Sequence, residues 1–170
     1  MSIVLINPQF AFNCDMVIRL AACYDLKAVW WSGDRVKIKP RRGSLVRQER
    51  AQGIPELAVM HSERPLDHCG GTPVAIEVRD NSERLQDFEH PEDAVYVFGP
   101  EDGSIPPPIL NRCHRFVVIP TRNQQCLNLQ TAVATVLWDR ALKRNHFPSI
   151  RLQSSLPDTE LYDDTGWPGA

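Results

Sequence analysis

The chain has 170 residues, which is enough for one domain with a sizeable hydrophobic core. Its formal net charge of −2 excludes the overall basic character of many nucleic-acid-binding proteins, so any surface that binds nucleic acid must be local. Five cysteines without a C-x-x-C pair are typical of a reducing compartment and argue against a disulfide framework.

The first thirty residues predict a strand, a helix and a second strand. Residues 3–6 form a short apolar run, and Asn13 or Asp15 can cap a helix that runs to about residue 24. Residues 27–31 are the second strand, and so compact a βαβ unit predicts a parallel sheet. The N-terminus lacks a basic leader and the apolar runs are too short to cross a membrane, so we expect a cytoplasmic protein.

A strongly basic segment follows at residues 34–50. It holds seven lysines and arginines against two acidic residues, a local charge of +5. The pattern predicts a loop that leads into a helix from about Ser44. Arg41, Arg42 and Arg47 are candidates for contact with a nucleic-acid phosphate backbone, because lysine and arginine supply most sequence-independent affinity. A solvated charged face explains the segment equally well.

The middle of the chain predicts two more strands. Residues 57–60 form one, and the loop after it contains His61, His68 and Cys69. These side chains lack zinc-finger spacing and a fourth ligand, so we expect no metal site.

Residues 73–78 form the next predicted strand, with Glu77 near its end. Asp80 and Glu83 have the spacing of a capping box, which predicts a short helix that runs through Phe88.

The densest pattern lies between residues 94 and 144. Residues 94–98 are β-branched, aromatic and apolar, which predicts a buried strand that stops at the glycine-rich loop 99–103. A short helix follows, and residues 115–120 predict a strand that ends in another loop. From Cys126 a long helix begins, with apolar residues at positions 129, 132, 133, 136, 137 and 141. Two strand ends and a helix start converge here, where open α/β folds bind ligands.

Three short motifs in this region carry a resemblance to a known family. Phe98-Gly-Pro-Glu-Asp-Gly103, Ile119-Pro120 and Leu127-Asn-Leu129 follow one another as they do in the SpoU/TrmH-like branch of the SPOUT methyltransferases, in its minimal single-domain type. The resemblance implies an α/β fold with a mostly parallel sheet, flanking helices and a C-terminal trefoil knot. It also implies S-adenosylmethionine as cofactor and a ribose 2′-hydroxyl of RNA as methyl acceptor.

The same resemblance implies where the cofactor binds. Ile119 and Leu127 are expected to hold the adenine, and at Gly99 a Cβ is expected to collide with the cofactor. Cys126 stands where the family has a serine, and a thiol is the weaker hydrogen-bond donor. The full set of expected cofactor-binding residues is Glu77, Gly99, Gly103, Ile119, Cys126 and Leu127.

Expected catalytic residues come from the family's first motif and from two of the loops. Asn13-Cys-Asp-Met-Val-Ile-Arg19 matches the first motif, although Asp15 and Met16 replace a glycine and a polar residue. Arg19 is expected to hold the ribose or a phosphate, because a guanidinium is a poor general base. Glu101 is expected to orient Arg19 or the asparagines, and Asn128 to fix the turn before the last helix.

The resemblance also bears on assembly and substrate. It implies a homodimer in which the first and last helices pack across the interface. We expect residues 1–145 to form the catalytic domain and residues 146–170 a tail. A start directly at the catalytic strand favours tRNA over ribosomal RNA. The alternative is a knotted RNA- or nucleotide-binding protein without turnover, which Cys126, Asp15 and Met16 favour.

Overall fold

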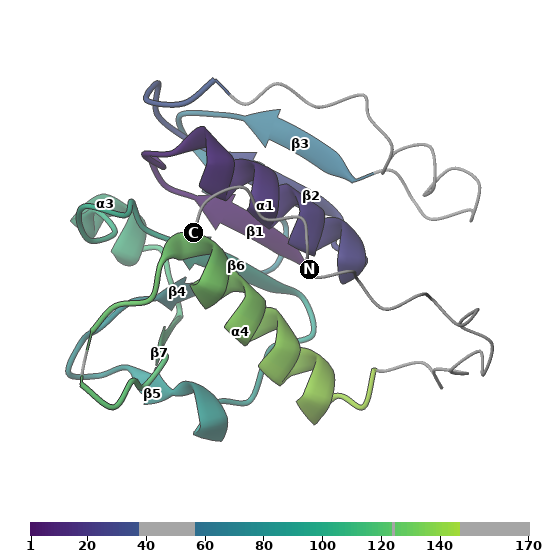
Figure 1. The fold of residues 1–170 in the computed structure, drawn as a ribbon, viewed down its shortest axis with the longest axis vertical. Coiled ribbons are helices and arrows are strands. Elements are labelled where there is room, and N and C mark those ends of the chain that lie inside the picture. Colours follow the sequence, from purple (N-terminus) through teal and green to yellow (C-terminus); the bar gives the residue numbers. More distant parts are fainter. Residues whose placement is uncertain (38–56, 124, 147–170) are drawn as a thin grey trace, which may run out of the picture.

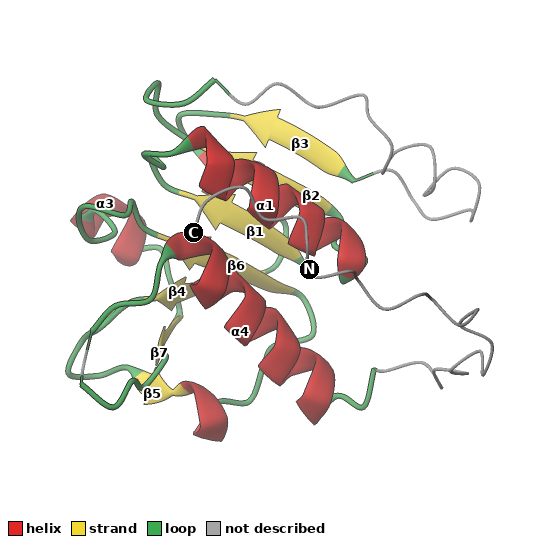
Figure 2. Ribbon diagram, in the orientation of Figure 1, coloured by secondary structure: helices red, strands yellow, loops and turns green. Residues whose placement is uncertain are grey.

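The computed structural model describes residues 1–37, 57–123 and 125–146, and its centre is a parallel sheet (Figures 1 and 2). Seven short strands lie in the order β3-β2-β1-β6-β4-β7-β5, and every neighbouring pair runs parallel. The strands are β1 (Ser2–Leu5), β2 (Ala28–Trp31), β3 (Ala58–His61), β4 (Thr72–Ile76), β5 (Glu83–Arg84), β6 (Ala94–Phe98) and β7 (Arg115–Val118). The predicted α/β class with a mostly parallel sheet is confirmed.

Helices cover both faces of this sheet. The two long ones, α1 (Ala11–Cys23) and α4 (Leu129–Lys143), lie side by side over one face (Figure 1). The other face packs against α3 (Pro107–Leu110) and the 3₁₀ turn η1 (Pro65–Asp67), and a second 3₁₀ turn, η2 (Leu85–Asp87), follows β5. The buried apolar side chains of α4 are those of Leu129, Val133, Val136, Leu137 and Ala141, as its predicted stripe requires. None of the described helices is long and apolar enough to cross a membrane.

Strand β6 shows why the sheet could be predicted from the sequence. It lies between β1 and β4, and all five of its residues are buried. Side chains alternate between the faces, so Tyr96 and Phe98 enter the core beneath α1 and α4, whereas Val95 and Val97 enter the core on the other face. A strand covered on both faces needs an unbroken apolar sequence, and residues 94–98 have one.

The predicted start of the first helix is wrong. The N-cap of α1 is Phe10, whose carbonyl accepts from the backbone N–H groups of Asn13 and Cys14, and no side chain caps the helix. Asn13 lies inside the first turn, where its side chain is free to bond to a distant loop. Position 13 therefore carries a long-range contact instead of a local cap.

The predicted capping box after β4 is wrong as well. Glu83 belongs to β5, where its backbone pairs with Val117 of β7. Its carboxylate accepts two hydrogen bonds from Arg115, both at 2.7 Å. Pairing with a neighbouring strand has overridden the local signal, and only the single turn η2 follows.

The last two turns of α4 hold the chain that leads into β6. Arg140 is only 6% exposed, and the two terminal nitrogens of its guanidinium donate to the carbonyls of Pro91 at 2.6 Å and Glu92 at 2.8 Å. It also donates to the hydroxyl of Tyr96 at 3.2 Å. One buried cation therefore satisfies three oxygens in front of and within the central strand.

His90 completes this buried polar cluster. Its two ring nitrogens lie 2.6 Å from the hydroxyl of Tyr96 and 2.8 Å from the carboxylate of Asp139. Burial lowers the pKa of His90 below its usual value, although Asp139 acts in the opposite direction. The ring is therefore neutral at pH 7, and Arg140 is the charged member of the cluster that lies deepest.

Candidate functional site

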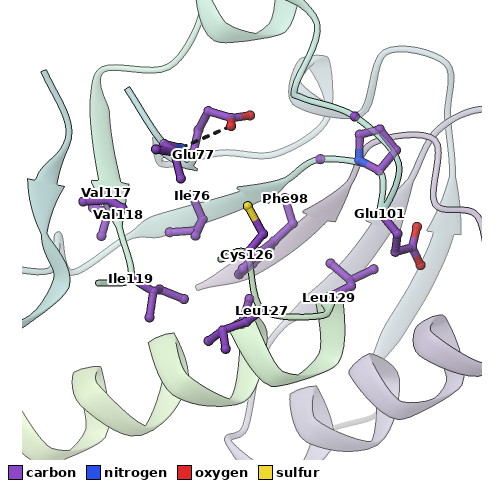
Figure 3. Close-up of a pocket in the computed structure, with 15 residues that line it drawn as sticks. Ile76, Glu77, Phe98, Glu101, Val117, Val118, Ile119, Cys126, Leu127 and Leu129 are labelled. Carbon is purple, nitrogen blue, oxygen red and sulfur yellow. Dashed lines mark hydrogen bonds between the residues drawn. The ribbon is translucent and has the colours of Figure 1, made fainter. Parts of the chain in front are cut away.

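A pocket opens where three neighbouring strands end and α4 begins (Figure 3). Because β4, β6 and β7 are parallel, their carboxyl ends lie at one edge of the sheet, as expected for a ligand site. The pocket is lined by Ile76, Glu77, Val78, Phe98, Gly99, Pro100, Glu101, Gly103, Val117, Val118, Ile119, Cys126, Leu127, Leu129 and Ala132. All six residues predicted from the sequence to bind the cofactor are among them.

The walls of the pocket are mostly apolar. Ile76 and Phe98 come from β4 and β6, and Ile119 follows β7. Leu127 precedes α4, and Leu129 is its first residue (Figure 3). Such walls suit a flat aromatic ring, whose orientation must then be fixed by a few polar groups.

The segment before α4 contains two polar side chains, those of Cys126 and Asn128. Cys126 is an exposed free cysteine whose thiol faces the pocket (Figure 3). Asn128 is the N-cap of α4, and its side-chain oxygen accepts from the backbone N–H of Thr131 at 3.0 Å. The expected turn-fixing bond of Asn128 is therefore present, and Asn128 does not line the pocket.

The loop from Gly99 to Ile105 closes one side of the pocket. A Cβ added at Gly99 would lie 3.1 Å from both Cγ1 and the backbone nitrogen of Ile105, which is tighter than ordinary contact. The space beside Gly99 is thus taken by the loop itself, which differs from the expected reason for glycine, a close approach of the cofactor. Gly103 donates its N–H to the carbonyl of Pro100 at 3.4 Å and completes a turn within the loop.

Glu77 joins the end of β4 to the same loop. One carboxylate oxygen accepts from the backbone N–H of Ile105 at 2.8 Å, and the other accepts from that of Val78 at 3.1 Å. Glu77 was expected to be a wall or a contact of the cofactor, and it does line the pocket. Its bond to Ile105 had no signal in the sequence.

Glu101 joins the loop to the start of α1. Its carboxylate accepts from the backbone N–H of Gln9 at 2.7 Å and from the side-chain amide of Asn13 at 2.8 Å. Asn13 was one of its expected partners. The pair of Glu101 and Asn13 places one anionic and one amide group at the rim of the pocket.

Arg19, the other expected partner of Glu101, lies elsewhere. It is exposed on α1, it does not line the pocket, and within the described residues it forms no hydrogen bond or ion pair. It comes six residues after Asn13, which places it about 9 Å further along the helix axis and about 120° around it. Arg19 therefore lies on a different side of α1 from Asn13 and is not part of the pocket of its own chain.

A third acidic contact braces the loop from outside. Asp102 accepts two hydrogen bonds from the guanidinium of Arg35, at 2.8 and 2.9 Å. These bonds from Arg35 lower the pKa of Asp102, and Asp102 raises that of Arg35. Sequence reasoning counted Arg35 only as part of the basic segment, because nothing in local spacing links positions 35 and 102.

Several predictions concern residues outside the described part of the chain. These are the helix expected from about Ser44, the arginines at positions 41, 42 and 47, and the tail from residue 147 onward. Among the described residues, no group of three or more histidine, cysteine, aspartate or glutamate side chains could hold a metal ion.

Comparison with known proteins adds a family and a set of similar folds. Residues 1–138 match the model of the SpoU rRNA methylase family. No curated protein sequence matches the chain.

Among solved structures, the A. aeolicus TrmH/SpoU tRNA-modifying enzyme is 17% identical with a TM-score of 0.67, over 85% of this chain and 75% of that chain. A structure concerned with 2-OH methylation of C/U34 on tRNA is 21% identical with a TM-score of 0.65, over 85% and 90%. AviRb from Streptomyces viridochromogenes, a SpoU methyltransferase in complex with AdoMet, is 16% identical with a TM-score of 0.65, over 86% and 61%. At these identities the likeness shows a shared fold, and the chain spans less than two thirds of AviRb.

Proposed function

The chain belongs to the SpoU rRNA methylase family and is therefore a SPOUT-class RNA methyltransferase, and we propose that it methylates a ribose 2′-hydroxyl of tRNA with S-adenosylmethionine as donor. One observation carries this proposal. The three loops whose motifs were recognised in the sequence converge on one pocket, at the strand ends where this fold can bind a ligand. The family also implies the C-terminal trefoil knot, which stays a prediction.

The residues of the pocket fit S-adenosylmethionine, which supplies an electrophilic methyl group on a sulfonium. Ile119 and Leu127 would hold the adenine between apolar side chains and offer main-chain hydrogen bonds to its edge. The exposed thiol of Cys126 would make the contact that a serine hydroxyl makes in the family, but more weakly.

The acceptor ribose would lie at the rim that Glu101 and Asn13 form. Methyl transfer needs the acceptor oxygen in line with the methyl group, so the main task of the protein is positioning. Glu101 is already fixed by two donors, which suits a carboxylate that orients a hydroxyl or an arginine. Arg19 would hold the ribose or a phosphate by charge-assisted hydrogen bonds.

The choice of tRNA as the RNA substrate rests on the similar structures. Two of the similar structures concern tRNA, and the chain covers most of the one that concerns C/U34. The test is a transfer assay with radiolabelled S-adenosylmethionine on total tRNA and on ribosomal RNA, followed by mapping of the modified nucleotide. Calorimetry measures cofactor binding alongside. Cofactor binding without transfer to any RNA would favour the alternative, a knotted RNA-binding protein without turnover.

We also propose a homodimer that packs α1 and α4 of each copy against the other. These helices lie side by side, and large apolar side chains are exposed on both: Phe12 on α1, with Phe10 at its N-cap, and Trp138 and Leu142 on α4. Large apolar side chains exposed on two neighbouring helices favour an interaction surface.

Light scattering at micromolar concentration is expected to give a dimer, and the Phe12→Asp/Leu142→Asp double variant is expected to give a monomer. Burying two carboxylates in an apolar interface is costly. The control is Val78→Asp, because Val78 is as exposed as Phe12, 66% in each case, but follows β4 by two residues and belongs to neither helix. A wild-type monomer, or a double variant that still dimerises, contradicts this interface.

The basic segment is proposed to contact the phosphates of the RNA. Replacing Arg41, Arg42 and Arg47 together by alanine is expected to weaken RNA binding and flatten its salt dependence, by about one unit of slope for each lost phosphate contact. Affinity for S-adenosylmethionine should not change. Filter binding over a range of salt concentrations measures the slope, with Lys27→Ala/Arg84→Ala as a control that removes two exposed charges elsewhere. An unchanged slope in the triple variant would mean that the segment is only a solvated face.

A further inference from the structure

The loop from Gly99 to Ile105 has a brace that belongs to neither its own strand nor α1. The backbone N–H of Ile105 donates to the carboxylate of Glu77 at 2.8 Å, and Ile105 is only 1% exposed. Without that carboxylate a buried N–H group would lose its acceptor, which is costly. The far end of the loop is thus fixed by the side chain of the residue that follows β4.

Glu77 is itself held firmly. Its backbone N–H donates to the carbonyl of Val117 at 2.9 Å, which continues the pairing of β4 with β7 by one residue. Its carbonyl accepts from the hydroxyl of Ser82 at 2.8 Å. The carboxylate therefore extends from a rigid point of the sheet edge, as a group that positions a loop must.

The part of the loop that Glu77 fixes is the part that faces the pocket. Ile105 lies against Gly99, so the two ends of the loop touch each other. The residues between them, Pro100, Glu101 and Gly103, line the pocket. A shift at Ile105 would therefore disturb the packing against Gly99 and, through it, the end of this wall that Glu101 and Asp102 do not anchor.

We propose that Glu77 is a positioning residue: it sets the cofactor-facing wall through the amide of Ile105, and not through a charge contact with the cofactor. The inference rests on the proposed function. It has a clear consequence, because S-adenosylmethionine carries a positive sulfonium whereas S-adenosylhomocysteine has a neutral thioether. If Glu77 contacted the sulfonium through its charge, replacing Glu77 would weaken the binding of S-adenosylmethionine only. If Glu77 positions the wall, replacing it would change the affinity for both ligands alike.

Two variants of Glu77 distinguish the effect of its side-chain length from the effect of its charge. Glu77→Asp keeps the charge but is one methylene too short for the N–H of Ile105, so both ligands should bind more weakly, by on the order of tenfold. Glu77→Gln loses the charge but keeps an oxygen that can accept from Ile105. It gives up only the longer bond to Val78, an exposed residue, so both affinities should stay within about threefold of wild type.

Calorimetry with each ligand measures these affinities, at a temperature well below the melting point of every variant. The control is Glu83→Ala, which removes a carboxylate that also accepts two short hydrogen bonds but does not line the pocket. A mild Glu77→Asp together with a severe Glu77→Gln, or a loss confined to S-adenosylmethionine, overturns the proposal in favour of a charge contact. Wild-type affinities in both variants also overturn the proposal, because the loop then needs no hydrogen bond from Ile105 to Glu77. A wild-type protein that binds neither ligand contradicts the proposed function itself.

Discussion

Replacing Arg19 by alanine is expected to lower methyl transfer by two or more orders of magnitude, roughly the loss expected for a key positioning group. The affinity for S-adenosylmethionine should stay nearly unchanged, because Arg19 does not line the pocket. The fold should tolerate the change, since Arg19 is exposed and has no hydrogen bond or ion pair within the described residues. Single-turnover transfer to tRNA and calorimetry with the cofactor measure the two effects separately.

The position of Arg19 sharpens this prediction. It does not line the pocket of its own chain, so we propose that in the homodimer it serves the pocket of the partner. Mixing Arg19→Ala chains with Glu101→Ala chains should then restore activity, because each mixed dimer contains one site with both residues intact. Random exchange would recover about a quarter of wild-type activity. If Arg19 acts within its own chain, no mixed dimer has a complete site and activity stays low.

A conservative variant tests what Arg19 supplies. Arg19→Lys keeps the charge but loses the two-pronged geometry with which a guanidinium binds a phosphate or carboxylate. Activity between those of wild type and alanine would indicate that both charge and geometry matter. If Arg19→Ala turns over normally, the assignment of the first motif to residues 13–19 is wrong.

The sequence predicted the fold where burial alone decides the structure. Strand β6 has the predicted bounds, 94–98, because a strand between two cores must be apolar throughout. The apolar stripe of α4 could be predicted equally well, because nearly all of its members pack into one core. The pocket followed from these elements, since the ends of parallel strands and the start of a helix must meet at one edge.

Polar contacts over long distances in the sequence were not predictable. Arg35 and Asp102 are 67 positions apart, and Glu77 and Ile105 are 28 apart. Periodicity reports which side of an element is buried, but it does not say which carboxylate meets which N–H group. The same reason explains the two wrong helix starts, since Asn13 and Glu83 have local capping chemistry but use their side chains on distant partners.

Arg140 is a residue that no sequence pattern singled out, and its replacement by methionine is expected to lower the free energy of unfolding by about 2–4 kcal/mol. Methionine fills much of the same volume, so the packing of α4 changes little. It leaves the carbonyls of Pro91 and Glu92 and the hydroxyl of Tyr96 without the donors that Arg140 provides. The segment they belong to leads into β6, so the central strand loses its anchor at one end.

Urea denaturation at a fixed protein concentration measures the loss as a shift of the midpoint with an unchanged slope. The matched control is Arg144→Met, one turn later on the helix. Arg144 donates to the carbonyl of His90 at 2.6 Å, but a quarter of its side chain is exposed, so water can replace it. Its loss should cost less than about 1 kcal/mol. Equal losses of unfolding free energy in the two variants would show that the hydrogen bonds of the buried Arg140 stabilise the fold no more than those of the partly exposed Arg144. Cofactor affinity, measured on folded protein, should be the same in both variants, because the pocket lies at the opposite end of β6.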